Sequence, residues 1–268
     1  MIRLPARTLP QDALDHLQSV QDQIDAEPTF AAQVAKAKTK WDGKKGSNAG
    51  KACFQSVQDT LTEMCQGARR CAYCEDSLAD EIEHVKPKNF FPDITFAWSN
   101  YLYACGPCNG KKSDTYFVFD AVSGAPERLI RGQEPPPGEP VFLDPRSEDP
   151  LDFLQIDILD TFRMVPNFDL DPEDQQRAEL TLEILALETG TAGHLVQARK
   201  QAYRNFRSRL KELVELFELD PHSETLKAEV ATFREMDHQS VWREMKRSHP
   251  ALPDIAPLFA RCPPAIDW

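Results

Sequence analysis

The sequence contains no apolar run that approaches the roughly 20 residues a membrane-spanning helix requires. Its first residues, MIRLPARTLPQDALDH, also lack the apolar stretch of a secretory signal peptide. No internal repeat is visible. These absences argue against a membrane protein and a signal-bearing secreted protein. We therefore expect a cytoplasmic globular protein, with 268 residues available for one large domain or two smaller ones.

The chain also lacks an excess of basic residues, with 31 Lys and Arg against 43 Asp and Glu and a formal net charge of −12. The charge is unevenly distributed, because residues 144–183 contain twelve acids and three arginines, whereas residues 199–211 contain six basic residues and no acid. Net charge is therefore a poor guide to nucleic-acid binding here. Four basic residues of the second segment would share one helical face, namely Lys200, Arg204, Arg207 and Lys211. This face either contacts phosphates or is the solvated side of that helix.

The seven cysteines do not form the even set that a disulfide framework requires. Four of them form two Cys-x-x-Cys pairs, and thirty residues separate the first pair from the second. Each pair supplies two thiolates from one tight turn, so the two pairs fit a tetrahedral zinc ion, which would contribute on the order of 10 kcal/mol to folding. Chance spacing or a redox pair is the alternative. The expected ligands are Cys71, Cys74, Cys105 and Cys108, and the pattern assigns no role to Cys53, Cys65 or Cys262.

Three regions differ in character along the chain. Residues 1–66 have the apolar spacing of helices, residues 67–125 contain the paired cysteines and short strand-like segments, and residues 126–268 are helical again after a proline-rich connector. In the last region Asp171 is typical of a helix start and Gly190 of that helix's end. The sequence predicts a mainly α protein with a small α+β core.

An acid and a histidine lie together between the two cysteine pairs, in the segment EIEHVKPK. Ile82 and Val85 favour a strand, and Pro87 would end it because proline cannot continue a hydrogen-bonded ladder. Glu83 and His84 would therefore lie at the end of a strand that the zinc site braces. Taken alone, such a pair is more often an ordinary surface feature than a catalytic one.

The second cysteine pair changes that interpretation. It lies in ACGPCNGKK, and Asn100 precedes it in WSN. In this combination the sequence resembles the HNH endonucleases, whose fold is also called ββα-metal. The cysteine-rich members have C-x2-C, an acid–His–hydrophobic-x-Pro segment, an Asn, and C-x2-C-(H/N)-x2-K. All of these elements occur in this order in residues 71–112, about a sixth of the chain.

The resemblance implies a catalytic divalent ion that Glu83 and Asn109 hold, separate from the structural zinc. Asn109 stands where many relatives have histidine, and an amide oxygen suits a hard ion such as Mg²⁺ or Mn²⁺. Because metal–oxygen distances are about 2.0–2.6 Å, we expect side-chain oxygens of these two residues within about 5–6 Å of one another.

The resemblance also implies roles for the other motif residues. His84 would be the general base that takes a proton from the attacking water, since a neutral imidazole is populated near neutral pH. Asn100 would fasten the loop and orient His84, while Lys112 and Lys111 would contact a phosphate. The implied reaction is hydrolysis of a nucleic-acid phosphodiester bond.

A finer resemblance extends over most of residues 70–200. The segments RCAYCE, IEHVKPK, FLDPRSEDP and LTLEILALE are similar to the PtuB-like HNH subunit of Septu-type anti-phage systems. That subset implies a nuclease effector beside an ATPase partner of the ABC/SMC kind. The acidic residues 144–183 are either a docking face for this partner or a surface with helix caps.

Two other functions remain open from the sequence. A stand-alone restriction-like HNH nuclease would carry the same motif without an ATPase. A non-catalytic zinc-knuckle interaction module would explain the cysteines but leaves Glu83, His84, Asn100 and Asn109 as coincidences. We expect DNA rather than RNA as the substrate, although such a site contacts phosphates rather than bases. Sequence preference, trigger and stoichiometry are not specified by these motifs.

Overall fold

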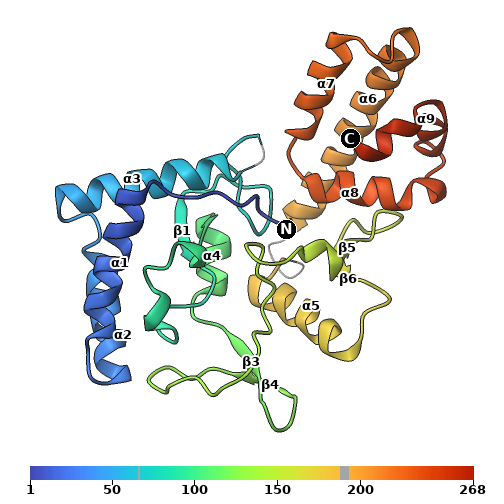
Figure 1. Cartoon of the computed structure of the whole chain (residues 1–268). Coiled ribbons are helices and arrows are strands. Elements are labelled where there is room, and N and C mark those ends of the chain that lie inside the picture. The colour runs from blue at the N-terminus through green and yellow to red at the C-terminus, as the bar shows by residue number, and fades with distance from the viewer. Residues whose placement is uncertain (66, 188–192) are drawn as a thin grey trace.

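The computed structural model describes residues 1–65, 67–187 and 193–268 and is mainly helical (Figure 1). The chain begins with three helices, α1 (Gln11–Asp25), α2 (Phe30–Asp42) and α3 (Asn48–Glu63). Thr29 and Ser47 start the second and third of these, because each hydroxyl accepts a hydrogen bond from a backbone N–H of the first turn. Helix α1 packs against both α2 and α3.

A strand–strand–helix unit follows, made of β1 (Glu81–His84), β2 (Tyr101–Ala104) and α4 (Gly106–Lys112). The strands are antiparallel, with Glu81 opposite Ala104 and His84 opposite Tyr101. The connection between them contains two short 3-10 helices, η1 (Pro92–Ile94) and η2 (Trp98–Asn100). Helix α4 begins directly after β2 because Cys105 is its N-cap residue and a proline lies in its first turn.

Two further hairpins connect this unit to the C-terminal part of the chain. They pair β3 (Phe117–Phe119) with β4 (Pro126–Arg128) and β5 (Leu154–Ile156) with β6 (Met164–Pro166), and η3 (Pro150–Asp152) precedes β5. In the described part of the chain the strands thus form three separate two-stranded sheets. The expectation of a mainly helical protein with few strands is confirmed.

The C-terminal part consists mainly of helices, namely α5 (Pro172–Leu185), α6 (Gly193–Leu219), α7 (Glu224–Arg234), α8 (Gln239–Ser248) and α9 (Ala256–Arg261), with η5 (His249–Ala251) and η6 (Pro263–Asp267). Helix α5 starts as expected, because the Asp171 carboxylate accepts hydrogen bonds from the backbone N–H groups of the first turn. It ends earlier than expected, since Ala186 adopts the left-handed conformation that closes it. Gly190 lies outside the described residues.

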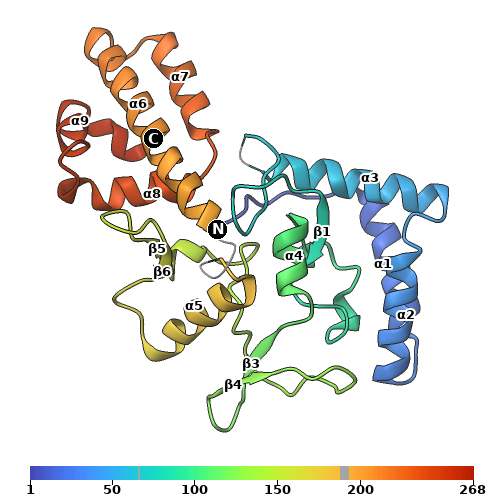
Figure 2. The same cartoon turned by 180° about the vertical axis from the view of Figure 1, so that it is seen from behind.

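Figures 1 and 2 show from opposite sides that the strand–strand–helix unit lies between the N-terminal helices and the C-terminal part of the chain. An apolar core lies on each side of the unit. The first core joins the N-terminal helices to one face of the β1–β2 hairpin and includes Phe54, Phe96 and Tyr101. The second includes the paired cysteines and continues through Phe142 to Phe206 on α6. The unit is therefore fixed from both sides by burial of apolar surface.

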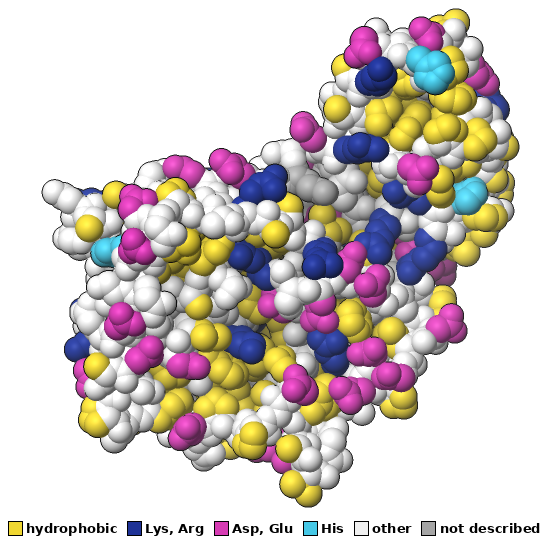
Figure 3. All heavy atoms as spheres, in the orientation of Figure 1, with side chains coloured by type: hydrophobic (Ala, Val, Ile, Leu, Met, Phe, Trp, Pro, Cys, Tyr) yellow, Lys and Arg dark blue, Asp and Glu magenta, His cyan; other side chains and the backbone are white. Residues whose placement is uncertain are grey.

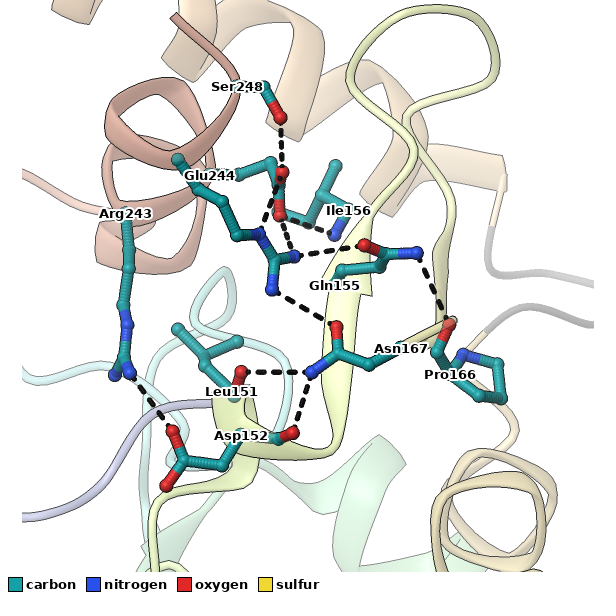
Figure 4. A network of polar contacts seen from close by, with 10 residues as sticks. Leu151, Asp152, Gln155, Ile156, Pro166, Asn167, Arg243, Glu244 and Ser248 are labelled. Atoms are coloured by element: carbon teal, nitrogen blue, oxygen red, sulfur yellow. Dashed lines mark hydrogen bonds and ion pairs between the residues drawn. The ribbon is translucent and has the colours of Figure 1, made fainter. Parts of the chain in front are cut away.

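Several acids of residues 144–183 are paired within the chain. Asp149 and Asp152 both accept hydrogen bonds from Arg243 on α8, and Glu148 lies 2.6 Å from Arg177. Figure 4 shows the neighbouring Glu244, whose buried carboxylate accepts hydrogen bonds from Ser248 and from the backbone N–H of Ile156. Asp149 and Asp152 thus join the segment around η3 to α8, Glu148 joins the chain before η3 to α5, and Glu244 of α8 contacts β5, structural roles that the expectation of an acidic docking face did not include.

Charges of both signs are mixed on the surface. On the face in Figure 3, Lys and Arg side chains are interspersed with Asp and Glu over the middle of the molecule. On α6, Arg207 lies 2.7 Å from Asp254, so part of the expected basic helical face is neutralised. No helix among the described residues is both long and apolar enough to cross a membrane.

Candidate metal centre and active-site cavity

The four paired cysteines converge at one end of the strand–strand–helix unit. All four are buried, and their sulfur atoms lie within 4.8 Å of one another. Cys74 Sγ lies 3.9 Å from Cys105 Sγ. A tetrahedral zinc with bonds of about 2.3 Å places neighbouring sulfurs about 3.8 Å apart. This arrangement could hold a zinc ion, as the spacing of the pairs predicted.

Backbone hydrogen bonds attach this centre to the hairpin. The N–H of Ala72 donates to the Tyr103 carbonyl at 2.9 Å, and the N–H of Asp80 donates to the Ala104 carbonyl at 3.1 Å. Cys105 and Cys108 lie at the start of α4, directly after β2. A bound zinc would therefore fix the turn that contains Cys71 and Cys74, the end of β2 and the start of α4 relative to one another.

The remaining cysteines lie elsewhere. Cys53 is buried in the N-terminal core, where its thiol donates to the Ala13 carbonyl at 3.5 Å and burial raises its pKa to about 11. Cys65 is partly buried at the end of α3, and Cys262 is buried among the C-terminal helices. Burial raises the pKa of both of these thiols as well. Their surroundings are those of packed side chains rather than reactive thiolates.

A cavity of about 340 Å³ lies next to the metal centre. It is lined by β1, the loop that follows β1, α4 and one side chain from α2. The motif residues Glu83, His84 and Asn109 all line it. The structure thus gathers into one cavity three of the four motif residues that the resemblance connects with catalysis. The expected separation of Glu83 and Asn109 oxygens stays a prediction.

His84 lies at the end of β1 and is only 5% exposed. Its Nε2 lies 2.9 Å from the Thr95 carbonyl oxygen. Because a carbonyl only accepts hydrogen bonds, Nε2 carries the hydrogen in the neutral ring and Nδ1 carries the lone pair. The ring of Trp41 covers the imidazole with 4.1 Å between centroids. Burial, assisted by the positive charge of Lys88, lowers the pKa of His84 to about 3, so the ring is neutral at physiological pH.

Glu83 forms a buried ion pair with the last residue of α4. Lys112 Nζ lies 2.7 Å from Glu83 Oε1 and also donates to the His84 carbonyl at 2.8 Å. Burial raises the pKa of Glu83, while the positive charge of Lys112 acts in the opposite direction. Lys112 is completely buried, so in this structure its ammonium holds α4 against β1 and has no exposed surface to offer the expected phosphate. Lys111 is exposed.

Asn100 lies outside the cavity and holds the loop that follows β1. Its Oδ1 accepts a hydrogen bond from the backbone N–H of Lys86 at 2.8 Å, and its Nδ2 donates to the carbonyls of Lys86 and Ile94 at 3.0 and 3.2 Å. The side chain therefore spans the two ends of the β1–β2 connection. Asn100 therefore fastens the loop that follows β1, whereas its expected role in orienting His84 stays a prediction.

Asn109 Nδ2 donates to Glu81 Oε2 at 2.5 Å. Glu81 and Glu83 are two residues apart on β1, so both point to the face that α4 covers. Glu81 therefore meets Asn109, and Glu83 meets Lys112 one turn further along the helix. The alternation of a strand could have revealed Glu81 as a cavity residue from the sequence.

Three other cavity residues were missed in the sequence. Asp114 follows α4, Lys88 follows β1, and Trp41 comes from a helix some forty residues away along the chain. No local pattern connects Trp41 with His84, because only the packing of α2 brings it there. Among the described residues, the four cysteines are the one group of three or more Cys, His, Asp or Glu side chains close enough to share an ion. The cavity therefore offers oxygen donors without forming a closed cage.

Comparison with known proteins gives a short but specific match. No family model matches the chain. Over 61 residues it is 42% identical to the Septu protein PtuB of Bacillus thuringiensis. The match covers 21% of this chain and 23% of that relative, so the chain matches less than a quarter of the relative's length. Over this portion the chain is related to a Septu PtuB protein.

Proposed function

We propose that this chain is a metal-dependent endonuclease of the HNH type that hydrolyses phosphodiester bonds in nucleic acid. The observation that carries the proposal is the cavity shared by Glu83, His84 and Asn109, on a strand–strand–helix unit next to four converging cysteines. An interaction module that uses only the cysteines would not require a buried, oriented histidine beside oxygen donors in a cavity. The motif order in the sequence supports the same conclusion.

His84 acts as the general base in this proposal. Its neutral imidazole accepts a proton from water at Nδ1, while the hydrogen bond from Nε2 to Thr95 fixes the plane of the ring. Asn100 contributes by holding both ends of the loop that carries Thr95. Since Trp41 covers His84, the geometry also keeps bulk water away from the base.

The oxygen donors of the cavity fit a hard divalent ion such as Mg²⁺ or Mn²⁺. Asn109 donates from Nδ2 to Glu81, which leaves Oδ1 as its possible ligand atom, and the Glu83 carboxylate would be the second ligand. When bound, such an ion lowers the pKa of water and offsets charge on the phosphoryl oxygens. Lys112 is buried against Glu83 and orients it, so it does not contact the phosphate in this proposal. The candidates for phosphate contact are Lys88, which lines the cavity, and the exposed Lys111.

We further propose that the nuclease is the effector of an anti-phage defence complex and that an ATPase is its partner. The partial match to a Septu protein supports this role. A protein of 268 residues contains far more helix than a motif of residues 71–112 needs, and these helices offer surfaces for a partner. A stand-alone nuclease is the alternative.

Cleavage assays test the nuclease proposal directly. The full chain is incubated with supercoiled plasmid and, separately, with structured RNA. Each is tested with Mg²⁺, with Mn²⁺ and with EDTA, and the zinc content is measured in parallel. We expect cleavage that EDTA abolishes and that Mg²⁺ or Mn²⁺ restores. His84→Ala should lower the rate by about 10²–10⁴-fold and leave zinc content and thermal melting unchanged, whereas the exposed His222→Ala serves as the matched control.

Two outcomes would contradict the proposal. If His84→Ala cleaves as fast as the parent protein, His84 is not the base. If neither the chain alone nor its complex purified from the native host cleaves DNA or RNA, the chain is an interaction module instead. Full activity of the isolated chain, unchanged by any co-purifying ATPase, would retain the nuclease and reject the complex.

A further inference from the structure

A second cavity, of about 580 Å³, adjoins the cavity that contains His84. The two cavities share Ser113 and Asp114, the residues that follow α4. The far side of the second cavity is formed by the end of β4 and the residues after it, among them Arg128, Ile130 and Arg131. A molecule in the first cavity could thus continue into the second past the end of α4.

The second cavity has basic side chains on its rim. Arg131 is 69% exposed, and its guanidinium lies 2.6 Å from Asp114. Arg128 is also exposed, and it donates to the Thr115 hydroxyl at 3.5 Å. Asp114 also accepts a hydrogen bond from Asn89, and the guanidinium of Arg131 balances its negative charge. Of the three charged side chains that line this cavity, two are arginines and one is Asp114, so the lining carries a net charge of +1 in a chain whose net charge is −12.

The two arginines are held at a defined place relative to α4. The N–H of Thr115 donates to the Lys112 carbonyl at 2.8 Å, and the N–H of Leu129 donates to the Tyr116 carbonyl at 3.0 Å. Leu129 is buried between the two exposed arginines and anchors the segment. Figures 1 and 2 agree in placing β3 and β4 beyond the end of α4. Backbone hydrogen bonds therefore link the segment that carries the two arginines to the residues that directly follow α4.

We propose that the second cavity binds the nucleic-acid strand next to the cleaved bond, with Arg128 and Arg131 contacting its flanking phosphates. This inference rests on the proposed nuclease function and adds a substrate-positioning site to it. Arginine suits the role because its planar guanidinium can donate two parallel hydrogen bonds to one phosphate. Ile130, which lies between them in the sequence, also lines the cavity, and its exposed side chain offers an apolar surface to the sugar or base.

The test measures binding separately from cleavage. A fluorescein-labelled DNA oligonucleotide is titrated with full-length His84→Ala protein over a series of salt concentrations, and fluorescence anisotropy gives the dissociation constant. This His84→Ala protein is the background, and a second protein adds Arg128→Gln and Arg131→Gln to it. The matched control removes two positive charges from exposed arginines on α7 and α9, by Arg234→Gln with Arg261→Gln, and Arg261 is paired with an acid as Arg131 is. Zinc content and thermal melting are compared for all proteins.

We expect the Arg128 and Arg131 changes to weaken binding at least tenfold at low salt. They should also reduce the slope of log K against log salt by about 0.7–0.9 for each phosphate that an arginine no longer neutralises. When Arg128→Gln and Arg131→Gln are made in the protein that retains His84, cleavage can be measured. There the two changes should raise KM more than they lower kcat. The control with Arg234→Gln and Arg261→Gln should bind like the background protein.

The outcomes separate the two proposals. The second cavity is not the strand site if the Arg128 and Arg131 changes weaken binding no more than the control changes do. This holds whether both double variants bind like the background protein or both bind more weakly by the same factor. The nuclease proposal stands in either case. If the background protein does not bind at any salt concentration and the unchanged protein does not cleave, both proposals fail.

Discussion

A single ammonium group, that of Lys112, connects the end of α4 to two successive residues of β1. It pairs with the Glu83 carboxylate and donates to the His84 carbonyl, and it is completely buried. A buried ion pair contributes little net stability, but removal of one partner leaves an uncompensated charge. Lys112 therefore determines the orientation of Glu83 and of the strand end that carries His84.

We expect Lys112→Met to reduce the free energy of unfolding by about 3–5 kcal/mol, because Glu83 then remains buried without its partner. Denaturant unfolding monitored by circular dichroism measures this change. The neighbouring exposed Lys111→Met should change stability by less than about 0.5 kcal/mol. Combining Lys112→Met with Glu83→Gln should recover part of the loss. Equal effects of the two lysine substitutions would contradict the ion pair.

The cover that Trp41 forms over His84 leads to a second prediction at the scale of the residue. Diethyl pyrocarbonate modifies neutral, accessible imidazoles, and mass spectrometry identifies the modified positions. We expect His84 to react much more slowly than His222, because His84 is 5% exposed whereas His222 is on the surface. Trp41→Ala should accelerate modification of His84 and leave that of His222 unchanged. Rapid modification of His84 in the unchanged protein would show that Trp41 does not shield the imidazole from reagent in solution.

At the scale of the element, α4 is short and depends on contacts at both of its ends. Cys105 and Cys108 anchor its start, and Lys112 anchors its last turn. A helix of seven residues is not stable in isolation, because nucleation is costly and few hydrogen bonds follow. Its position over β1, and hence the contact of Asn109 with Glu81, follows from these two anchors.

Loss of one cysteine should therefore disorder α4. We expect Cys74→Ser or Cys108→Ser to lower zinc from about one ion per chain and to make the segment around α4 sensitive to proteolysis. Zinc analysis and limited proteolysis with mass spectrometry measure the two effects. Cys65→Ser is the matched control, since Cys65 is partly buried and lies outside the four-cysteine group. Full zinc content and normal melting of either ligand variant would refute the four-cysteine site.

At the scale of the whole molecule, charged side chains of α8 attach the C-terminal helices to η3 and to the β5–β6 hairpin. Arg243 pairs with Asp149 and Asp152, and the buried Glu244 accepts a hydrogen bond from the Ile156 backbone. Acids that the sequence segregates into residues 144–183 thus meet arginines from a distant helix. On the face in Figure 3, the uneven charge along the chain becomes a mixture of both signs once the chain is folded.

Charge reversal can separate the folding role of these acids from a docking role. We expect Asp149→Lys with Asp152→Lys to destabilise the protein by on the order of 1 kcal/mol, because both replace an attraction to Arg243 by a repulsion. The exposed pair Asp160→Lys with Asp169→Lys should leave stability unchanged. If the acidic segment docks a partner, the second pair should nevertheless weaken co-purification from the native host. Unfolding curves and pull-downs measure the two effects, and unchanged co-purification would reject an acidic docking face.

The sequence by itself determined the features that depend on residues close together in the chain. The spacing of the two cysteine pairs predicted four converging sulfurs, because each turn of a Cys-x-x-Cys segment presents two thiolates. Asp171 predicted a helix start because its carboxylate can reach only the N–H groups of the next turn. The mainly helical character followed in the same way from local apolar spacing.

Only the tertiary structure decided the features that depend on distant residues. The cover of Trp41 over His84, the burial of Lys112 on Glu83, and the adjoining cavity with Arg131 all require elements far apart in sequence to pack together. A lysine in a motif looks the same in the sequence whether it points to solvent or into the protein. Its environment is set by which helix covers which strand, and that choice is made by the burial of apolar surface over the whole chain.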